Sequence, residues 1–136
     1  MRILVISNLY PPYHLSGYEL GCRNIVESLK TRGHQIKVLT STYRAGKAQI
    51  ERDVYRWMKR DFKETSDWHP VFLKEIINQT AFKRLCREFP PDIVFIFNLS
   101  RVSISLPLLA MNGVMDRGAA KREYPPPALR KDRAAK

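Results

Sequence analysis

The sequence has few residues of the kinds that build covalent or metal-linked scaffolds. Its two cysteines, Cys22 and Cys86, form no CxxC pair, and no histidine stands beside them at metal-ligand spacing. Both fall on apolar stripes at helical spacing, so we expect reduced, buried thiols and no metal site. Reduced thiols are typical of a cytoplasmic protein, which is the location we expect.

Long apolar runs and an acidic excess are lacking as well. No segment approaches the roughly 20 apolar residues of a membrane span, and the apolar run after Arg2 is too short for a signal peptide. The 24 lysines and arginines outnumber the 13 acidic residues and give a net charge of +11. This charge favours anionic partners such as nucleotides, phosphosugars, a membrane surface or nucleic acid, without choosing among them.

Two nucleotide-binding motifs are also missing. There is no GxGxxG, and the second expected strand ends in Thr40-Ser41-Thr42 without an acidic residue for ribose, which argues against a dehydrogenase. No GxxxxGK[ST] loop occurs, which argues against a kinase or an ATPase. Because a Ser–His–Asp set is recognised by geometry, the sequence assigns no catalytic residue.

What is present begins with a strand–helix–strand pattern. The apolar run Ile3-Leu4-Val5-Ile6 predicts a strand covered on both faces. Ser16 and Glu19 have the spacing of a capping box, and Gly33 is placed to end the helix in a left-handed conformation. The helical side chains predicted to face the sheet are Tyr18, Cys22, Ile25, Val26 and Leu29. A second strand follows at once, so a parallel, right-handed crossover is expected.

Farther along, the pattern predicts another long helix and another buried strand. The helix covers 71–88 and ends before a Pro-Pro pair. Its candidate core residues are Phe72, Ile76, Phe82, Leu85 and Cys86. The strand covers 93–97, an uninterrupted apolar run.

Other segments give weaker signals. The region 43–69 has no firm assignment, and 54–57 fits either a short strand or a helical turn. A short helix weakened by its proline is expected over 102–111. From Asn112 the amphipathic period ends, so we expect 112–136 to be a disordered basic tail, the product of a truncation or a frame shift. The packed domain is therefore expected to end at residue 111.

Candidate binding residues gather at the expected carboxyl edge of the sheet, where ligands of open α/β sheets bind. Ser16, Gly17 and Tyr18 start a helix whose N-terminus suits a pyrophosphate, and Gly17 allows close approach. An ordinary capped helix would carry the same residues. Asn98 follows the third strand and is expected at the same edge. Further candidates are His14, which also fits a solvated loop, and Glu19, Ser100 and Arg101.

A stretch of alternating basic and aromatic residues offers another interpretation. Residues 52–68 carry arginines and lysines between tyrosine, tryptophan and phenylalanine, as nucleic-acid or membrane surfaces do. Acidic residues such as Glu51, Asp53 and Asp61 dilute this charge. We therefore expect a solvated segment whose aromatic side chains dock on the domain, and we do not expect nucleic acid to be the partner.

Taken together, these features resemble the start of the family 4 retaining glycosyltransferases, which have the two-domain GT-B fold. The matching segments are Ile3-Leu4-Val5-Ile6, Tyr10-Pro11-Pro12, Ser16-Gly17-Tyr18-Glu19, Arg32-Gly33-His34, Val38-Leu39-Thr40 and Pro91-Asp92-Ile93-Val94. The family usually has glycine where Ser16 stands and often a histidine near Asn98, so no histidine role is carried over to this chain.

The resemblance implies an α/β fold: a Rossmann-like three-layer sandwich with a mainly parallel sheet, the incomplete N-terminal half of a GT-B fold. It also implies transfer of a sugar from a nucleotide-sugar donor to an acceptor, with the nucleotide-sugar as substrate and no metal or cofactor. The family's glycine turn, which approaches the donor diphosphate and the acceptor, corresponds to Ser16 and Gly17.

Nothing in the chain matches the family's donor-binding domain with its paired glutamates. We therefore expect a fragment that is inactive alone. The alternative is a non-catalytic module that binds a nucleotide or a partner protein. The positive charge leaves open a peripheral position at a membrane surface for either.

Overall fold

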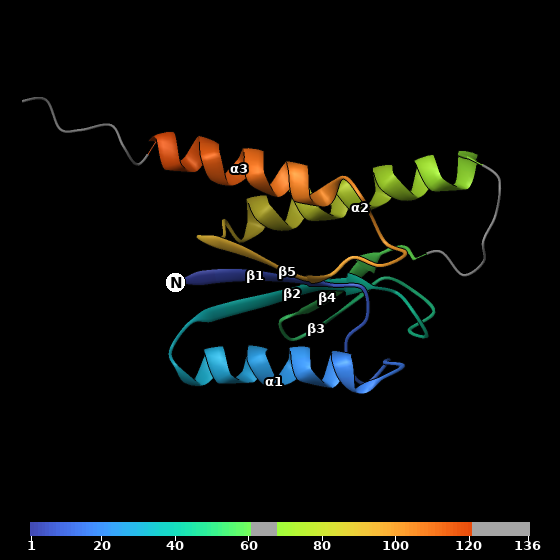
Figure 1. The fold of residues 1–136 in the computed structure, drawn as a ribbon, viewed down its shortest axis with the longest axis horizontal. Helices are drawn as coiled ribbons and strands as arrows, with labels where there is room; N and C mark the ends of the chain where they lie inside the picture. The colour runs from blue at the N-terminus through green and yellow to red at the C-terminus, as the bar shows by residue number, and fades with distance from the viewer. Residues whose placement is uncertain (61–67, 121–136) are drawn as a thin grey trace, which may run out of the picture.

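The computed structural model describes residues 1–60 and 68–120 and is an α/β sandwich of three layers (Figure 1). The elements along the chain are β1 (Arg2–Ser7), α1 (Gly17–Thr31), β2 (Gln35–Ser41), β3 (Gln49–Glu51), β4 (Val54–Met58), α2 (Trp68–Glu88), β5 (Ile93–Asn98) and α3 (Leu106–Ala120). The strand order is β3-β4-β2-β1-β5; β4, β2, β1 and β5 are parallel, and β3 is antiparallel to β4. The predicted Rossmann-like fold with a mainly parallel sheet is confirmed.

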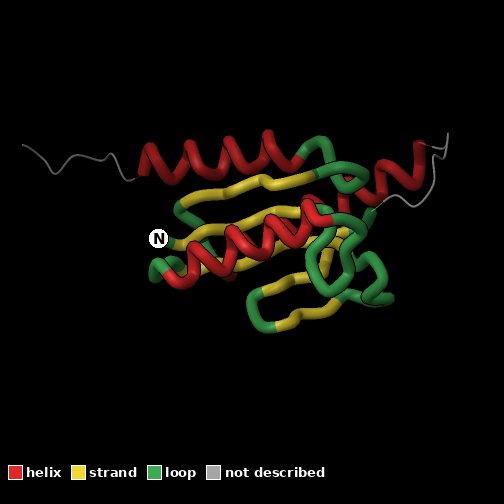
Figure 2. The backbone as a smooth tube through the Cα atoms, turned by 60° about the horizontal axis from the view of Figure 1, so that its bottom comes forward, coloured by secondary structure: helices red, strands yellow, loops and turns green. Residues whose placement is uncertain are grey.

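The two faces of the sheet are covered by different helices. Helix α1 lies on one face, while α2 and α3 lie together on the other (Figure 1). The β3–β4 hairpin forms one edge of the sheet and β5 forms the other (Figure 2). Strand β1 lies between β2 and β5, as a continuous apolar run predicts for a central strand.

Each face has its own apolar core because side chains alternate along the strands. Ile3 and Val5 of β1 face α1, whereas Leu4 and Ile6 face α2 and α3. The core under α1 comprises Ile3, Val5, Tyr10, Cys22, Val26, Ile36 and Val38. Burying an aliphatic side chain of this size stabilises the fold by about 1.5–3 kcal/mol.

Helix α1 ends with the predicted signal. Gly33 has a φ of 85°, in the left-handed region. Its N–H donates to the Lys30 carbonyl (2.9 Å), and the His34 N–H donates to the Leu29 carbonyl (3.2 Å). This pair of bonds is the Schellman arrangement, which pairs the last helical carbonyls.

The core prediction for α2 was partly wrong. Phe82 and Leu85 are buried as expected, but Phe72 is 57% exposed and Ile76 is 46% exposed. The buried stripe of the helix runs through Asn78, Phe82 and Leu85 at helical spacing, and the two exposed residues lie off this stripe. A polar residue thus occupies a position that the sequence pattern reserves for an apolar one.

Three further burial predictions also differ from the structure. Tyr18 and Ile25 of α1 are exposed instead of facing the core; Tyr18 lies in the first turn of the helix, where its ring contacts Phe97 at the end of β5. Cys22 is buried as expected, whereas Cys86 is only half-buried.

The region left open by the sequence contains the missing parallel strand. Residues 54–57 lie in β4, which pairs with β2, and β3 precedes it in a hairpin. Arg52, in the hairpin turn, has a φ of 54°. The strand pattern is hidden in the sequence because Arg56, a charged residue, is one of its buried positions.

Helix α3 begins and ends later than predicted, at Leu106 and Ala120 instead of 102 and 111. Pro107 lies in its first turn, where the missing N–H needs no partner. The start of the predicted tail is therefore helical. The rest of that tail, 121–136, lies outside the described residues.

Candidate functional site

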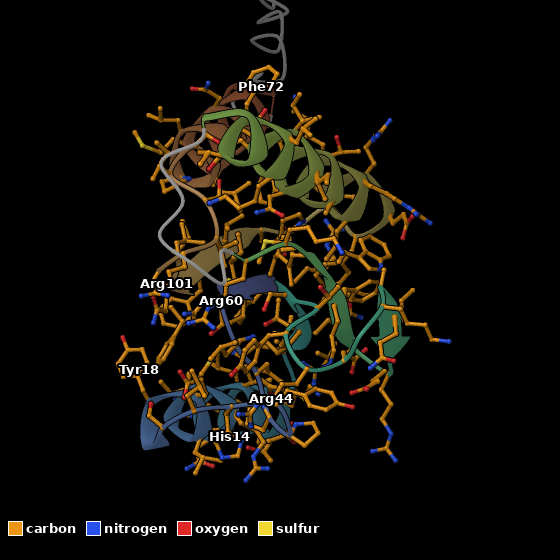
Figure 3. All side chains as sticks on the ribbon, turned by 90° about the vertical axis from the view of Figure 1, so that its right-hand side faces the viewer. His14, Tyr18, Arg44, Arg60, Phe72 and Arg101 are labelled. Atoms are coloured by element: carbon orange, nitrogen blue, oxygen red, sulfur yellow. The ribbon has the colours of Figure 1, made fainter. Side chains whose placement is uncertain are left out.

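The parallel strands β4, β2, β1 and β5 all end at one edge of the sheet. The chain leaves β1 for α1 on one face and leaves β5 for α3 on the other, although β1 and β5 are neighbours (Figure 1). Such a divergence is the topological switch point at which open α/β folds bind ligands. The register at this point pairs Ser7 with Asn98 (Figure 3 looks onto this edge).

The loop between β1 and α1 is anchored to both neighbouring strands through Asn8. Its N–H donates to the Asn98 carbonyl (2.8 Å), and its Nδ2 donates to the Ser100 carbonyl (3.3 Å). The Asn8 carbonyl accepts a hydrogen bond from Ser41 Oγ (2.5 Å) at the end of β2. The start of the loop therefore has one fixed position at the switch point.

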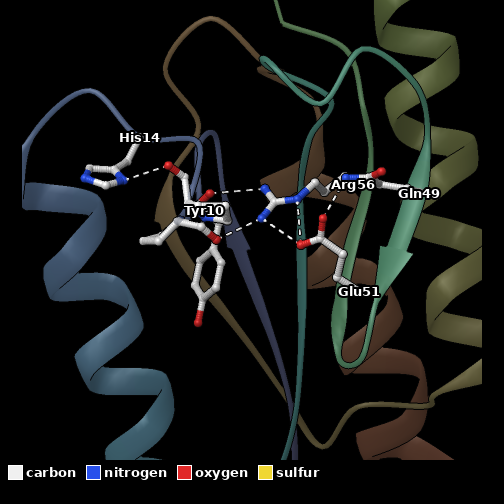
Figure 4. Close-up of polar contacts among 7 residues, drawn as sticks. Tyr10, His14, Gln49, Glu51 and Arg56 are labelled. Atoms are coloured by element: carbon white, nitrogen blue, oxygen red, sulfur yellow. Dashed lines mark hydrogen bonds and ion pairs between the residues drawn. The ribbon is translucent and has the colours of Figure 1, made fainter.

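Arg56 of β4 holds the next part of the loop (Figure 4). The side chain is 1% exposed; Nη1 donates to the Tyr10 carbonyl (3.1 Å) and Nη2 to the Pro11 carbonyl (2.8 Å). Glu51 Oε2 lies 3.4 Å from Nη2, and the guanidinium carbon lies 4.9 Å from the centre of the Tyr13 ring. With its donors used internally, Arg56 shapes the loop and has little left to offer a ligand. Sequence reasoning missed this role because a lone arginine among aromatic residues resembles a solvated patch.

The predicted capping box begins α1. Ser16 Oγ accepts a hydrogen bond from the Tyr18 N–H (3.2 Å), and Glu19 Oε2 accepts bonds from the Ser16 N–H and Oγ (2.9 Å each). Burial acts to raise the pKa of Glu19, but these hydrogen bonds outweigh it and hold the pKa below its ordinary value. Ser16 and Glu19 are thus committed to each other.

Gly17 leaves open space beside the capping box. A Cβ built on Gly17 meets nothing within 4 Å, and the backbone there is not left-handed. The fold therefore places no steric demand for glycine at this position, and a ligand could approach the backbone closely.

Tyr18 bridges the two diverging elements. Its hydroxyl donates to the Phe97 carbonyl at the end of β5 (3.4 Å), and the two ring centres lie 4.6 Å apart. The phenol ring is otherwise exposed at the edge (Figure 3). An exposed aromatic face at the switch point is a surface on which a sugar or base could stack.

The other predicted site residues lie in the loops at the same edge. Asn98 Oδ1 accepts a bond from the Ser100 N–H (2.8 Å), which tightens the turn after β5. Arg101 is exposed in this turn and has a φ of 60°. His14 is half-buried in the first loop, and its Nδ1 lies 3.1 Å from the Pro12 carbonyl oxygen. The structure thus brings the loops after β1 and β5 together, as the sequence predicts.

Comparison with known proteins adds one relative. No protein-family profile matches the chain, and no solved structure matches it. A curated protein of Klebsiella pneumoniae, named "Uncharacterized 42.6 kDa protein in cps region", is 25% identical over 120 residues. The match covers 78% of this chain and 32% of the relative, so the chain spans about a third of the relative's length.

Asn78, in the buried stripe of α2, is a second residue that sequence reasoning missed. Its Oδ1 accepts a bond from the Lys59 N–H (2.7 Å), and its Nδ2 donates to the carbonyls of Lys59 (2.9 Å) and Val102 (2.8 Å). The side chain therefore ties the segment after β4 to the turn after β5. An asparagine at a core position of a helical pattern was the available signal.

Over the described ranges 1–60 and 68–120, no group of three or more His, Cys, Asp or Glu side chains could hold a metal ion. Within those same ranges, no helix has both the length and the apolar character needed to cross a membrane.

Proposed function

We propose that this chain is the N-terminal, acceptor-side part of a glycosyltransferase that moves a sugar from a nucleotide-sugar donor to an acceptor. The observation that carries the proposal is the β1–α1 turn at the switch point, where Gly17 is open although no steric contact requires glycine. A nucleotide diphosphate could approach the backbone here, at the positive end of α1.

The residues around this turn divide into supports and contacts. Ser16 and Glu19 satisfy each other and fix the helix start, so we assign them a positioning role. Gly17, Tyr18 and Asn98 lie at the carboxyl edge beside the loops after β1 and β5, and they are the residues we expect to touch the substrate. The nucleotide-sugar serves as substrate, and the proposal needs no metal or cofactor.

The relative supports this class of function without establishing it. Its printed name places it in a cps region, that is, a capsule polysaccharide region, and polysaccharide assembly requires sugar transfer. Since residues 1–136 span about a third of the length of that protein, we propose that a second domain completes the donor-binding site. By itself the chain would then bind substrate without turnover.

A second candidate is a non-catalytic module that binds a nucleotide or a partner protein. The exposed apolar side chains along β5, Ile93 and Phe95, favour a partner. Sugar transfer by the chain joined to a donor-binding domain would decide for the enzyme, and nucleotide binding without transfer would decide for the module.

The first test is calorimetric titration of the chain with UDP-, GDP- and dTDP-hexoses. Gly17→Val should weaken binding at least about tenfold, since a side chain would block an approach worth about one charged hydrogen bond. Gly21→Val is the matched control, because Gly21 lies in the next turn of α1 and also has nothing within 4 Å. Equal binding by both variants, or no binding of any nucleotide-sugar, would overturn the proposal.

A further inference from the structure

Three arginines from three different loops lie at the carboxyl edge of the sheet (Figure 3). Arg44 follows β2, Arg60 follows β4 and Arg101 follows β5; together they are called the arginine cluster. None of the three has a carboxylate partner among the described residues. The carboxyl edge thus carries a concentration of positive charge that these residues do not neutralise.

Aromatic stacking holds two members of the cluster. The guanidinium carbon of Arg44 lies 5.2 Å from the centre of the Tyr43 ring, and that of Arg60 lies 5.0 Å from the same centre. Cation–π contacts orient a guanidinium but leave its charge and its N–H donors available. Tyr43 therefore gathers the two cations while keeping them able to bind an anion.

The buried Asn78 side chain brings the third arginine close. It bonds to both backbone groups of Lys59, the residue before Arg60, and to the carbonyl of Val102, the residue after Arg101. One fully buried amide therefore joins the backbone next to Arg60 to the backbone next to Arg101, and Figure 3 labels these two arginines beside each other. The cluster is held by hydrogen bonds of the scaffold.

Two of the arginines occupy backbone positions that favour glycine. Arg44 has a φ of 57° and Arg101 a φ of 60°, and in each turn the next residue donates its N–H to the carbonyl two residues before the arginine (3.0 Å). This is the third position of a type II turn, where glycine is the usual residue. Keeping arginine there costs stability, and strain of this kind gathers at functional sites.

The third arginine has an unsatisfied donor. The Nε of Arg60 is shielded from solvent and has no hydrogen-bond partner among the described residues. A charged donor left without a partner is costly and is rarely kept without use. A ligand oxygen would supply an acceptor that the described residues do not.

We infer that the arginine cluster binds a phosphate or diphosphate group of the substrate. Guanidinium groups pair with phosphate oxygens through two parallel N–H bonds, which suits arginine better than lysine. The inference rests on the proposed function for the reaction and adds the chemical class of the group that is bound. The diphosphate could belong to the nucleotide-sugar or to the acceptor.

The test is titration of the whole chain with inorganic pyrophosphate. Arg60→Gln and Arg101→Gln should each weaken binding about tenfold, the loss expected for one charge-assisted hydrogen bond. Arg32→Gln makes the same charge change at the other end of α1 and should bind like the unsubstituted chain. Equal affinities for all of them, or an equal loss in Arg32→Gln, would overturn the inference.

A second variant guards against loss by misfolding. Arg101→Gly removes the guanidinium and places the usual residue in the strained turn, so its melting temperature should be unchanged or higher while pyrophosphate binding weakens. A variant that is as stable as the parent and retains full affinity would count against the cluster.

Two further ligands separate the sources of the diphosphate. If Arg60→Gln weakens UDP but not geranyl diphosphate, the cluster serves the donor; the reverse assigns it to a diphosphate-bearing acceptor. Nucleotide-sugar binding that depends on Gly17, together with pyrophosphate, UDP and geranyl diphosphate binding that are all indifferent to Arg60→Gln, would sink the inference and leave the proposed function. Pyrophosphate binding through the cluster, without any nucleotide-sugar binding, would support the inference and overturn the proposed function.

Discussion

Two neighbouring strands carry apolar side chains on the same face of the sheet, but these side chains differ in how far they are buried. Ile3 of β1 is 5% exposed, and Ile93, its register partner in β5, is 42% exposed. Val5 and its partner Phe95 repeat the contrast. The difference comes from their neighbours, because α1 packs over β1 and β2 and leaves Ile93 and Phe95 of β5 exposed, while Phe97 at the end of the strand packs against this core (Figure 1).

Strand β5 and its surroundings, called the β5 flank, are also incompletely packed on the other face of the sheet. A cavity of about 480 Å³ lies there, lined among others by Phe82, Cys86, Val94, Leu109 and Ala110. Apolar character alone therefore does not decide burial in this chain. The burial of an apolar side chain depends on whether a helix packs over it. Helix α1 packs over Ile3 and Val5 of β1, whereas Ile93 and Phe95 of the β5 flank are exposed.

The largest effect should come from truncating matched isoleucines in the two regions. Ile3→Ala should lower the free energy of unfolding by about 2–4 kcal/mol, because it removes a buried side chain and leaves a cavity. Ile93→Ala should cost less than about 1 kcal/mol, since much of that side chain is already in water. Urea unfolding of both variants measures this. Equal losses would mean that the β5 flank is covered in solution.

Arg56 and Arg84 give the same contrast for arginine. Arg56→Met should cost about 1–3 kcal/mol, because the buried carbonyls of Tyr10 and Pro11 lose their donors. Arg84, exposed on α2, stacks on Trp57, so Arg84→Met should cost less than about 1 kcal/mol. Thermal unfolding compares the two, and amide exchange of residues 10–15 should accelerate only in Arg56→Met.

Two carboxylates that accept hydrogen bonds from the residues at the starts of α1 and α3 should make the fold acid-sensitive. Hydrogen bonds from Ser16 hold the pKa of Glu19 below its ordinary value of 4.5, against the opposing effect of burial. The pKa of Glu75 is lowered in the same way by Ser103 and Ser105, again against burial. A lowered folded pKa contributes stability that is present above the ordinary value and is lost as the pH falls through the folded pKa.

We therefore expect the free energy of unfolding to decrease as the pH is lowered below about 4.5. Glu19→Gln should remove part of this slope and cost about 0.3–1 kcal/mol at neutral pH, the usual contribution of an anion at a helix N-terminus. Denaturant titrations at several pH values provide the measurement. Identical slopes for Glu19→Gln and the parent would contradict the capping role.

The smallest effect should be in thiol labelling. Burial raises the pKa of Cys22 from its ordinary value of 9.0 to about 11, so at pH 8 it carries roughly 100-fold less thiolate than an ordinary cysteine. Cys86 lines the cavity on the β5 flank and is half-buried. Iodoacetamide should therefore modify Cys86 first under native conditions, with Cys86→Ser as the control. Faster modification of Cys22 would reverse the comparison.

Most of the fold could be predicted from local signals in the sequence. The capping box at Ser16 and the glycine after α1 are confirmed because they depend on residues close together in the chain. Strand β4 could not be assigned from the sequence because one of its buried positions holds Arg56. The guanidinium donors of Arg56 find their acceptors on carbonyls of a loop that is distant in sequence. Burial on α2 was misjudged because Asn78 takes an apolar position.

The candidate site was predictable in place but not in composition. That the loops after β1 and β5 meet follows from parallel topology. That Arg44, Arg60 and Arg101 gather there depends on three loops and on the contacts of Tyr43 and Asn78. No spacing in the sequence encodes such an arrangement.

The most direct test of the central claim is an amide chemical-shift map of the chain during titration with UDP-glucose and with pyrophosphate. The account expects shifts confined to the carboxyl edge, at residues 8–18, 43–45, 60 and 98–102. Shifts centred on the β5 flank around Ile93 and the cavity, or no shifts with either ligand, would contradict it.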